Sequence, residues 1–165
     1  MNNIILNLSN GISDKENAPK LLSGTGEEKV HLCVVLTSDR GLCGGFNTNI
    51  IKKAKLYFQK IIDDGKTLKI ITVGSKGYDQ LKRTYKENIV EKISFKDSKN
   101  INYLDAEKVG KMIIENFEKK EFDVCTIFYN KFKNVITQIP QEQQIIPLKS
   151  SDLDDKSEMD NYEFE

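Results

Sequence analysis

Short apolar runs alternate with amphipathic segments of helical spacing, and this alternation limits the folds open to the chain. The run His31–Thr37 is continuous and β-branched at its centre, as in a strand covered on both faces. Further runs lie at residues 68–74, 89–95 and 123–129, with helical segments at 46–65, 75–85 and 102–120. A helix between two strands makes a right-handed crossover that leaves the strands parallel. The pattern therefore predicts a three-layer α/β/α Rossmann-like domain with a mostly parallel sheet.

The ends of these segments carry turn and capping signals. The last two strand-like runs have no helix between them, and the chain turns back through Asn134, which predicts a C-terminal antiparallel hairpin. Gly65 is expected to end the first helix, whereas Ser75 and Asn102 are expected to cap the second and third. The apolar stripe expected on the third helix comprises Leu104, Val109, Met112, Ile113 and Phe117.

The chain divides into three parts by composition. Residues 30–149 form the expected globular α/β domain. Residues 1–29 begin with the apolar stretch MNNIILNLSN, too short for a free helix, and continue as a connection rich in glycine that is expected to be exposed. Residues 150–165 form an acidic tail, in which Asp152–Glu165 has seven acidic residues against one lysine, a net charge of −6. From composition alone this tail is interpreted as a solvated end.

Composition also excludes several classes of protein. The formal net charge of the chain is zero, which gives no reason to expect a nucleic-acid binder. No apolar run approaches the roughly 18 residues of a membrane span, and the N-terminus lacks the basic start of a signal peptide. The three cysteines are odd in number and lack CxxC spacing, so we expect neither disulfides nor a zinc site. No metal and no cofactor are predicted.

The glycine-rich loop SDRGLCGGFN, residues Ser38–Asn47, follows the first strand. Doubly wound sheets often bind phosphate at this position. However, Gly41, Gly44 and Gly45 do not follow the G-x-G-x-x-G pattern, and no lysine follows as in a P-loop. We therefore predict that the loop binds neither NAD nor ATP, and that its glycines permit a tight turn with positive φ.

Nucleophilic catalysis is not indicated by the reactive side chains. The single histidine, His31, opens a strand at the end opposite the loop that holds Cys43, so the two should not meet. Cys33 and Cys125 lie in apolar strands and are expected in the core. Asp39 beside Arg40 could be an acid with a charge partner, but we interpret the two as a pair that stiffens the loop.

Four segments in order resemble the gamma subunit of F-type ATP synthases. The loop SDRGLCGGFN is similar to the signature of that family, and so are VGSKGYDQLKR, YNKFKNVITQIP and QQIIPL. The acidic stretch with its NYEFE end resembles the segment before the family's last helix. The resemblance implies a non-catalytic rotor subunit of the central stalk, which couples ion translocation to ATP synthesis by rotation. A Rossmann-like nucleotide-binding domain or small enzyme, and a separate regulatory module, remain as alternatives.

The resemblance also implies partners and a location. Family members pair long terminal helices inside the ring of alpha and beta subunits, whereas this chain stops before the second helix, so we expect an excised domain. The loop should face the beta subunits, and the aromatic-acidic segment should lie near epsilon and the c-ring, which makes the acidic tail an interface. The implied interface residues are Arg40, Gly41, Leu42, Cys43, Tyr162, Phe164 and Glu165. The expected location is the cytoplasmic face of a bacterial inner membrane, in preference to the matrix side of the mitochondrial one, without direct membrane insertion.

Overall fold

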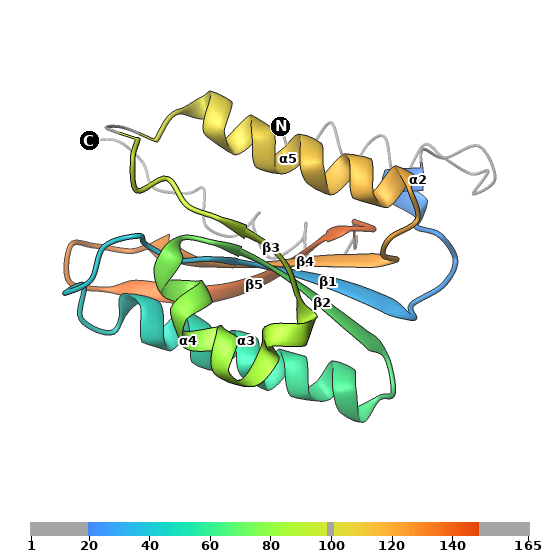
Figure 1. Cartoon of the computed structure of the whole chain (residues 1–165), viewed down its shortest axis with the longest axis horizontal. Coiled ribbons are helices and arrows are strands. Elements are labelled where there is room, and N and C mark those ends of the chain that lie inside the picture. The colour runs from blue at the N-terminus through green and yellow to red at the C-terminus, as the bar shows by residue number, and fades with distance from the viewer. Residues whose placement is uncertain (1–19, 99–100, 149–165) are drawn as a thin grey trace, which may run out of the picture.

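The computed structural model describes residues 20–98 and 101–148, which form one five-stranded sheet with helices on both faces (Figure 1). The expected stalk remnant at residues 1–10 and the acidic tail at 150–165 lie outside the described residues. The strands are β1 (Val30–Leu36), β2 (Thr67–Val73), β3 (Ile89–Ile93), β4 (Val124–Phe132) and β5 (Gln138–Ile146). The helices are α2 (Lys20–Ser23), α3 (Phe46–Asp63), α4 (Ser75–Tyr85), the 3-10 turn η1 (Lys86–Asn88) and α5 (Tyr103–Glu118).

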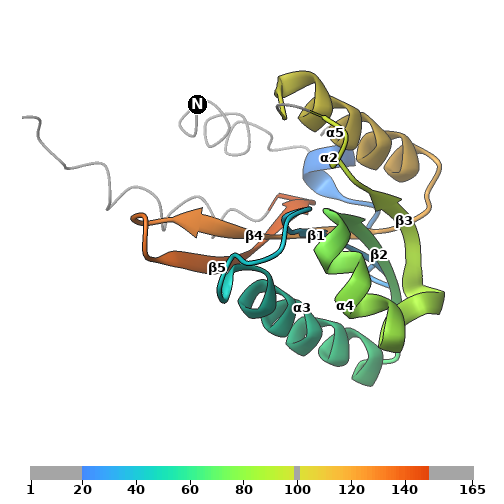
Figure 2. The ribbon, with the colours of Figure 1, turned by 60° about the vertical axis from the view of Figure 1, so that its left-hand side comes forward.

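The strand order is β3-β2-β1-β4-β5, with β1 at the centre. β1 pairs in parallel with β2 and β4, β2 pairs in parallel with β3, and β4 pairs antiparallel with β5. Helices α3 and α4 cover one face, and α5 with α2 lies on the other (Figures 1 and 2). The predicted layers, the mostly parallel sheet and the C-terminal hairpin are therefore confirmed. Within the described residues, no helix combines the length and apolarity needed to cross a membrane.

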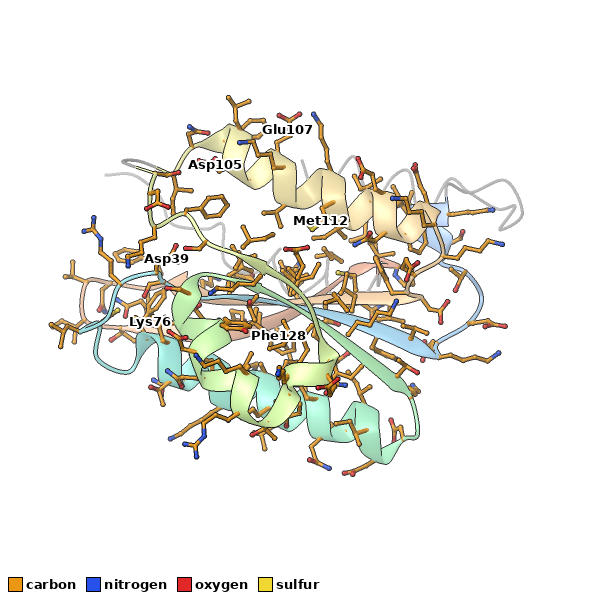
Figure 3. The ribbon with its side chains drawn as sticks, viewed as in Figure 1. Asp39, Lys76, Asp105, Glu107, Met112 and Phe128 are labelled. Atoms are coloured by element: carbon orange, nitrogen blue, oxygen red, sulfur yellow. The ribbon has the colours of Figure 1, made fainter. Side chains whose placement is uncertain are left out.

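Two hydrophobic clusters occupy the two faces of the sheet. Successive residues of β1 point to opposite faces, so Cys33 packs in the α3 cluster whereas Leu32 packs in the α5 cluster. Phe128 points toward the α3 and α4 layer, and Met112 points from α5 toward the sheet (Figure 3). Cys125 is buried in the α5 cluster. The continuous apolar runs thus reflect strands covered on both sides, and the core positions of both strand cysteines are confirmed.

The helix ends agree with the capping signals in two of three cases. Gly65 has φ 70° and ends α3, with its N–H donating to Ile62 and the next N–H donating to Ile61. Asn102 caps α5 in a capping box with Asp105. The expectation for Ser75 was wrong, because α4 begins at that residue with no side-chain cap of its own.

Two further expectations need correction. Leu104 does not belong to the buried stripe of α5: its side chain is 61% exposed, since the turn that carries it is oriented by the buried Asp105 of the capping box. The connection before β1 is not exposed throughout, because α2 places Leu21 against the α5 cluster. Thr25 then donates a hydrogen bond of 2.7 Å to Asp123, which joins this connection to the start of β4.

Candidate functional site at the carboxyl edge of the sheet

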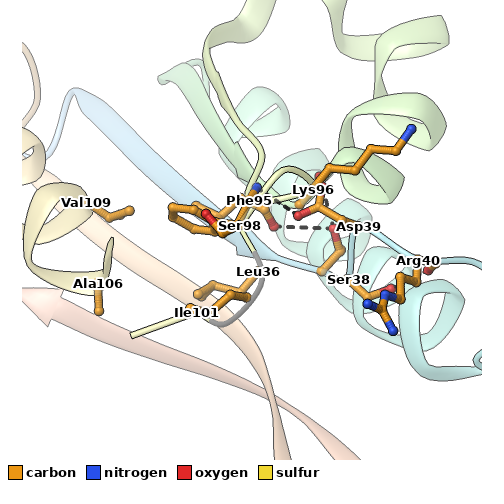
Figure 4. Close-up of a pocket in the computed structure, with 13 residues that line it drawn as sticks. Leu36, Ser38, Asp39, Arg40, Phe95, Lys96, Ser98, Ile101, Ala106 and Val109 are labelled. Carbon is orange, nitrogen blue, oxygen red and sulfur yellow. Dashed lines mark hydrogen bonds between the residues drawn. The ribbon is translucent and has the colours of Figure 1, made fainter. Parts of the chain in front are cut away.

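Asp39 lies at the centre of the edge where β1, β2 and β3 end. Its Oδ1 accepts hydrogen bonds from Ser75 N and Ser94 Oγ, both 2.7 Å long. Its Oδ2 accepts from Phe95 N at 2.9 Å (Figure 4). Thr37 adds a second cap from the same loop, because its Oγ1 accepts from Gly77 N at 2.8 Å. The loop after β1 therefore supplies the cap that α4 lacks in its own sequence.

These contacts also fix the charge of the Asp39 carboxylate. Partial burial alone would raise its pKa, but the hydrogen bonds from Ser94, Ser75 and Phe95 outweigh this effect and hold the pKa below its ordinary value. The positive end of the α4 dipole favours the same ionised form. Asp39 does stiffen the loop, but its carboxylate is held by two backbone amides and the Ser94 hydroxyl, and the expected pair with Arg40 is not among the ion pairs of the described residues.

Asn47, in the first turn of α3, holds the other side of the loop. Its Oδ1 accepts from Ser38 N, and its Nδ2 donates to Ser38 Oγ, each at 2.9 Å. Ser38 Oγ donates in turn to the Arg40 carbonyl at 2.6 Å, and Cys43 Sγ donates to the same carbonyl at 3.2 Å. Sequence reasoning missed Asn47. A signal existed, because the residue shares a helical face with Ile50 and is therefore a polar group in a buried position that needs partners.

Between these anchors the loop projects Leu42 into solvent. The Leu42 side chain is fully exposed, and its backbone has φ 60°, a left-handed conformation that costs about 1–2 kcal/mol for an L-residue. Gly44 has φ 54°, as the glycine-rich loop predicted, but Gly41 and Gly45 do not have positive φ. An exposed leucine held in a strained conformation is typical of a functional position.

The tip of the β4–β5 hairpin lies beside this loop. Asn130 Nδ2 donates to the Phe46 carbonyl at 3.0 Å, which connects β4 to the start of α3. A hollow of about 440 Å³ is lined on one side by residues 43–46 and on the other by residues 135–138. The exposed apolar side chains at this end are Leu42, Phe132, Val135 and Ile136.

A larger pocket of about 600 Å³ opens between the ends of β1 and β2 and the start of α5 (Figure 4). Its walls are mainly apolar and include Leu36, Phe95 and Val109, whereas Arg40 and Lys96 are its basic residues. Neither histidine nor cysteine is among the lining residues. The pocket offers apolar surface, hydroxyl groups and the Asp39 carboxylate, which already accepts hydrogen bonds from Ser75, Ser94 and Phe95.

The reactive side chains lie apart, as expected. His31 is buried at the start of β1, at the opposite edge of the sheet from Cys43; its pKa is lowered by burial and by the nearby charge of Lys66. Cys43 is exposed, whereas burial raises the pKa of Cys125 to about 12 and also raises that of Cys33. Among the described residues, no group of three histidine, cysteine or acidic side chains could hold a metal ion.

The loop residues Arg40, Gly41, Leu42 and Cys43 are exposed together at this edge, and the structure brings the hairpin tip beside them. The expected interface residues Tyr162, Phe164 and Glu165 lie outside the described residues. The carboxyl edge therefore combines an anchored loop, an apolar tip and an apolar pocket. This arrangement suits contact with another molecule better than it suits chemistry.

Known proteins with similar sequences and structures share one description. The family model described as ATP synthase matches residues 1–165. The ATP synthase gamma chain of Pelagibacter ubique is 88% identical over all 165 residues, which cover 57% of that relative. The gamma chain of Rhizobium etli is 49% identical over 150 residues, 91% of this chain and 51% of that relative. The chain thus spans a little more than half the length of these relatives.

Solved structures give the same fold. A chain in the central stalk and c-ring structure of the Tetrahymena thermophila mitochondrial ATP synthase matches with a TM-score of 0.69 and 25% identity, over 87% of this chain and 59% of that one. A chain in the rotor of the Euglena gracilis mitochondrial ATP synthase matches with a TM-score of 0.56 and 20% identity, over 98% of this chain and 58% of that one.

Proposed function

The chain belongs to the gamma chain family of ATP synthases, and we propose that it forms the globular part of a central-stalk rotor that performs no catalysis itself. The rotor couples ion translocation through a membrane ring to ATP synthesis in the catalytic head. In this role the domain must transmit torque, so its useful properties are a rigid body and defined contact surfaces. The two clusters that enclose β1 supply the rigid body.

One observation carries the assignment of a contact surface. The loop from Arg40 to Cys43 presents a strained, fully exposed Leu42, while Asp39 and Asn47 anchor the loop on both sides. A preorganised apolar contact loses little conformational entropy when it meets a partner. The partner of this loop is the C-terminal domains of the beta subunits.

The remaining partners follow from the family. Alpha and beta subunits surround the shaft, epsilon and the c-ring contact the foot, and Tyr162, Phe164 and Glu165 belong to the latter contact. Residues 1–29 comprise the remnant of a stalk helix and a linker, residues 30–149 form the globular domain, and residues 150–165 lead to the second stalk helix. The complex lies on the cytoplasmic face of a bacterial inner membrane. The structure of a central stalk with its c-ring from Tetrahymena thermophila supports the contact with the c-ring, and the bacterial sources of the gamma chain relatives support the location.

A disulfide lock tests the beta contact. The complete gamma chain carrying this segment is assembled with alpha and beta subunits, and a cysteine is introduced into a beta C-terminal domain. A disulfide requires Cα atoms within about 7 Å, so the assay is spatially strict. Oxidation should join Cys43 to beta and stop ATP hydrolysis, and reduction should restore it.

The strand cysteines serve as internal controls. Cys33 and Cys125 are buried and should not react under the same conditions. If Cys43 never forms a crosslink while either strand cysteine does, the placement of the loop is wrong. Calorimetric titration with millimolar NAD or ATP tests the alternative function, and saturable binding at residues 41–45 would favour a nucleotide-binding domain.

A further inference from the structure

We propose that the pocket between the ends of β1 and β2 and the start of α5 binds a small amphipathic carboxylate, an acid whose apolar body is the size of two fused rings. The ring system lies on the apolar walls, and the carboxylate faces Arg40, Lys96 and Ser98 on the polar side. The inference concerns a small molecule and does not rest on the proposed rotor role.

The pocket lies where an open, mostly parallel sheet commonly takes a ligand. The succession of strands changes direction at β1, because β2 and β3 follow on one side and β4 on the other. At such a point the carboxyl ends of the strands border a crevice. Residues 36–40, at the end of β1, and Val73 and Gly74, at the end of β2, line the pocket. Its volume of about 600 Å³ is within the range of small-molecule sites, about 300–1,000 Å³.

One side of the pocket is apolar surface of the core that remains open. Leu36, Phe95 and Val109 pack against the α5 cluster but are only partly buried. The Phe95 ring points toward Val109 across the pocket (Figure 4). Ile101, also in the lining, is 68% exposed. Removal of this surface from water favours a ligand with an apolar body.

The opposite side carries an excess of positive charge. Its charged residues are Arg40, Lys96 and Asp39. The Asp39 carboxylate already accepts three hydrogen bonds, whereas neither Arg40 nor Lys96 is in an ion pair among the described residues. Ser98 adds a hydroxyl group to the lining. Two cations and a hydroxyl favour an anionic group, and the planar guanidinium of an arginine matches a carboxylate in geometry.

The start of α4, where such sheets often bind phosphate, is already occupied. Ser75 N donates to Asp39 Oδ1 at 2.7 Å, and Gly77 N donates to Thr37 Oγ1 at 2.8 Å. A phosphate group would have to displace these bonds to reach the amides. A single carboxylate held by side chains is therefore the anion that suits this pocket. The bonds of Asp39 also join the loop to the segment after β3, so the pocket is preformed.

Titration of the full 165-residue chain with naphthoate tests the site. Naphthoate should bind with a Kd of about 1 mM or below, measured from amide signals in NMR spectra. The signals of Gly74, Ser98 and Val109 should shift most, whereas that of Gly65, at the opposite edge of the sheet, should not move. Naphthamide has the same rings without the charge and should bind about fivefold more weakly. Naphthylmethylammonium, with the opposite charge, should bind more weakly still.

Charge removal tests the role of the two cations. Arg40→Gln with Lys96→Gln should weaken naphthoate binding about fivefold and leave naphthamide binding unaltered. Both side chains are exposed, so the chain should fold normally. The matched control is Arg83→Gln with Lys86→Gln, which removes one exposed arginine and one exposed lysine outside the lining. It should alter neither probe.

Filling the pocket tests its shape. Ala106 is an exposed residue of α5 in the lining, so Ala106→Trp should place an indole in the apolar space and weaken naphthamide binding at least tenfold. The control Glu115→Trp lies nine residues later, on the opposite side of the helix and outside the lining. It should leave naphthamide binding unaltered. The amide spectrum of each variant shows whether the chain is folded.

Each contrary outcome overturns a stated part of the inference. Shifts centred elsewhere in the chain would overturn the site, and equal binding of all three probes would overturn the carboxylate. An equal loss in both pairs of charge variants would show a general effect of net charge and would overturn the role of Arg40 and Lys96. No binding of naphthoate at about ten times the expected Kd would overturn the inference as a whole. The crosslink between Cys43 and beta tests the proposed function separately and would be unaffected.

Discussion

Asp39 illustrates how one side chain can organise a surface that it does not itself form. Its carboxylate binds the first amide of α4 and the segment after β3, so that the loop carrying Leu42 is attached to two neighbouring crossovers. Hydrogen bonds that amides donate to charged acceptors are among the stronger hydrogen bonds in proteins. The projecting leucine can therefore remain in its strained conformation because the residues before it are held in place.

Replacement of Asp39 by asparagine should lower the free energy of unfolding by about 2 kcal/mol at pH 7, because the amide group cannot accept all three hydrogen bonds. The folded pKa of Asp39 lies below its unfolded value. Its contribution is thus complete above about pH 4 and is lost as pH falls through the folded pKa. Urea unfolding should be measured for parent and variant at pH 7 and pH 3. The difference between their free energies of unfolding should be smaller at pH 3. The control Asp97→Asn changes an exposed residue and should leave the free energy of unfolding almost unaltered. An equal difference between parent and Asp39→Asn at both pH values would contradict this account.

At the scale of elements, α3 and α5 end in the same way with different residues. Gly65 and Lys120 both occupy the left-handed position after the helix, with φ 70° and 59°. In each case the following N–H donates back to the last helical turn, from Lys66 to Ile61 and from Glu121 to Asn116. Glycine adopts this conformation without strain, whereas lysine does not. The end of α5 therefore stores strain that the end of α3 avoids.

Lys120→Gly should accordingly stabilise the domain by about 0.5–1 kcal/mol. The strain relieved in the folded state is larger than the free-energy cost of the greater backbone freedom that glycine has in the unfolded chain. The measurement is the shift in the midpoint of urea unfolding, with the dependence of the unfolding free energy on urea concentration unchanged. Lys119→Gly is the matched control, because φ at that residue is −75° and glycine there brings only the entropic cost. The explanation fails if both substitutions change stability in the same direction.

At the scale of the whole molecule, β1 connects the two hydrophobic clusters. Cys33 on this strand faces the α3 cluster, while Cys125 on the neighbouring β4 faces the α5 cluster. Loss of β1 from the sheet would expose both faces at once. In the proposed rotor role this arrangement would favour a rigid body, because opening the sheet at β1 disrupts both clusters.

We therefore expect the described domain to unfold in one cooperative transition. In a Cys43→Ser background, thiol labelling under native conditions should give Cys33 and Cys125 the same opening free energy, equal to that of global unfolding. Cys43 in the parent chain should label at once, since it is exposed. A clearly lower opening energy for Cys125 alone would show that the α5 layer separates independently.

The strands and helices could be predicted from the sequence because their signals are local. Continuous apolar runs require strands buried on both faces, and helical spacing with Gly65 and Asn102 determines where helices end. The burial of Cys33 and Cys125 follows from their places in such runs. The glycine spacing of the loop and its resemblance to a known signature were likewise visible in the order of residues.

Only the tertiary structure decided which distant residues meet. The cap of α4 comes from Asp39, 36 residues earlier, in place of the local cap that was expected from Ser75. The left-handed Leu42 could not be foreseen, because the glycines beside it were the expected carriers of positive φ. The hairpin tip and the loop adjoin only because β4 lies next to β1 in the sheet. Strand order depends on the packing of both faces, and no local sequence pattern specifies it.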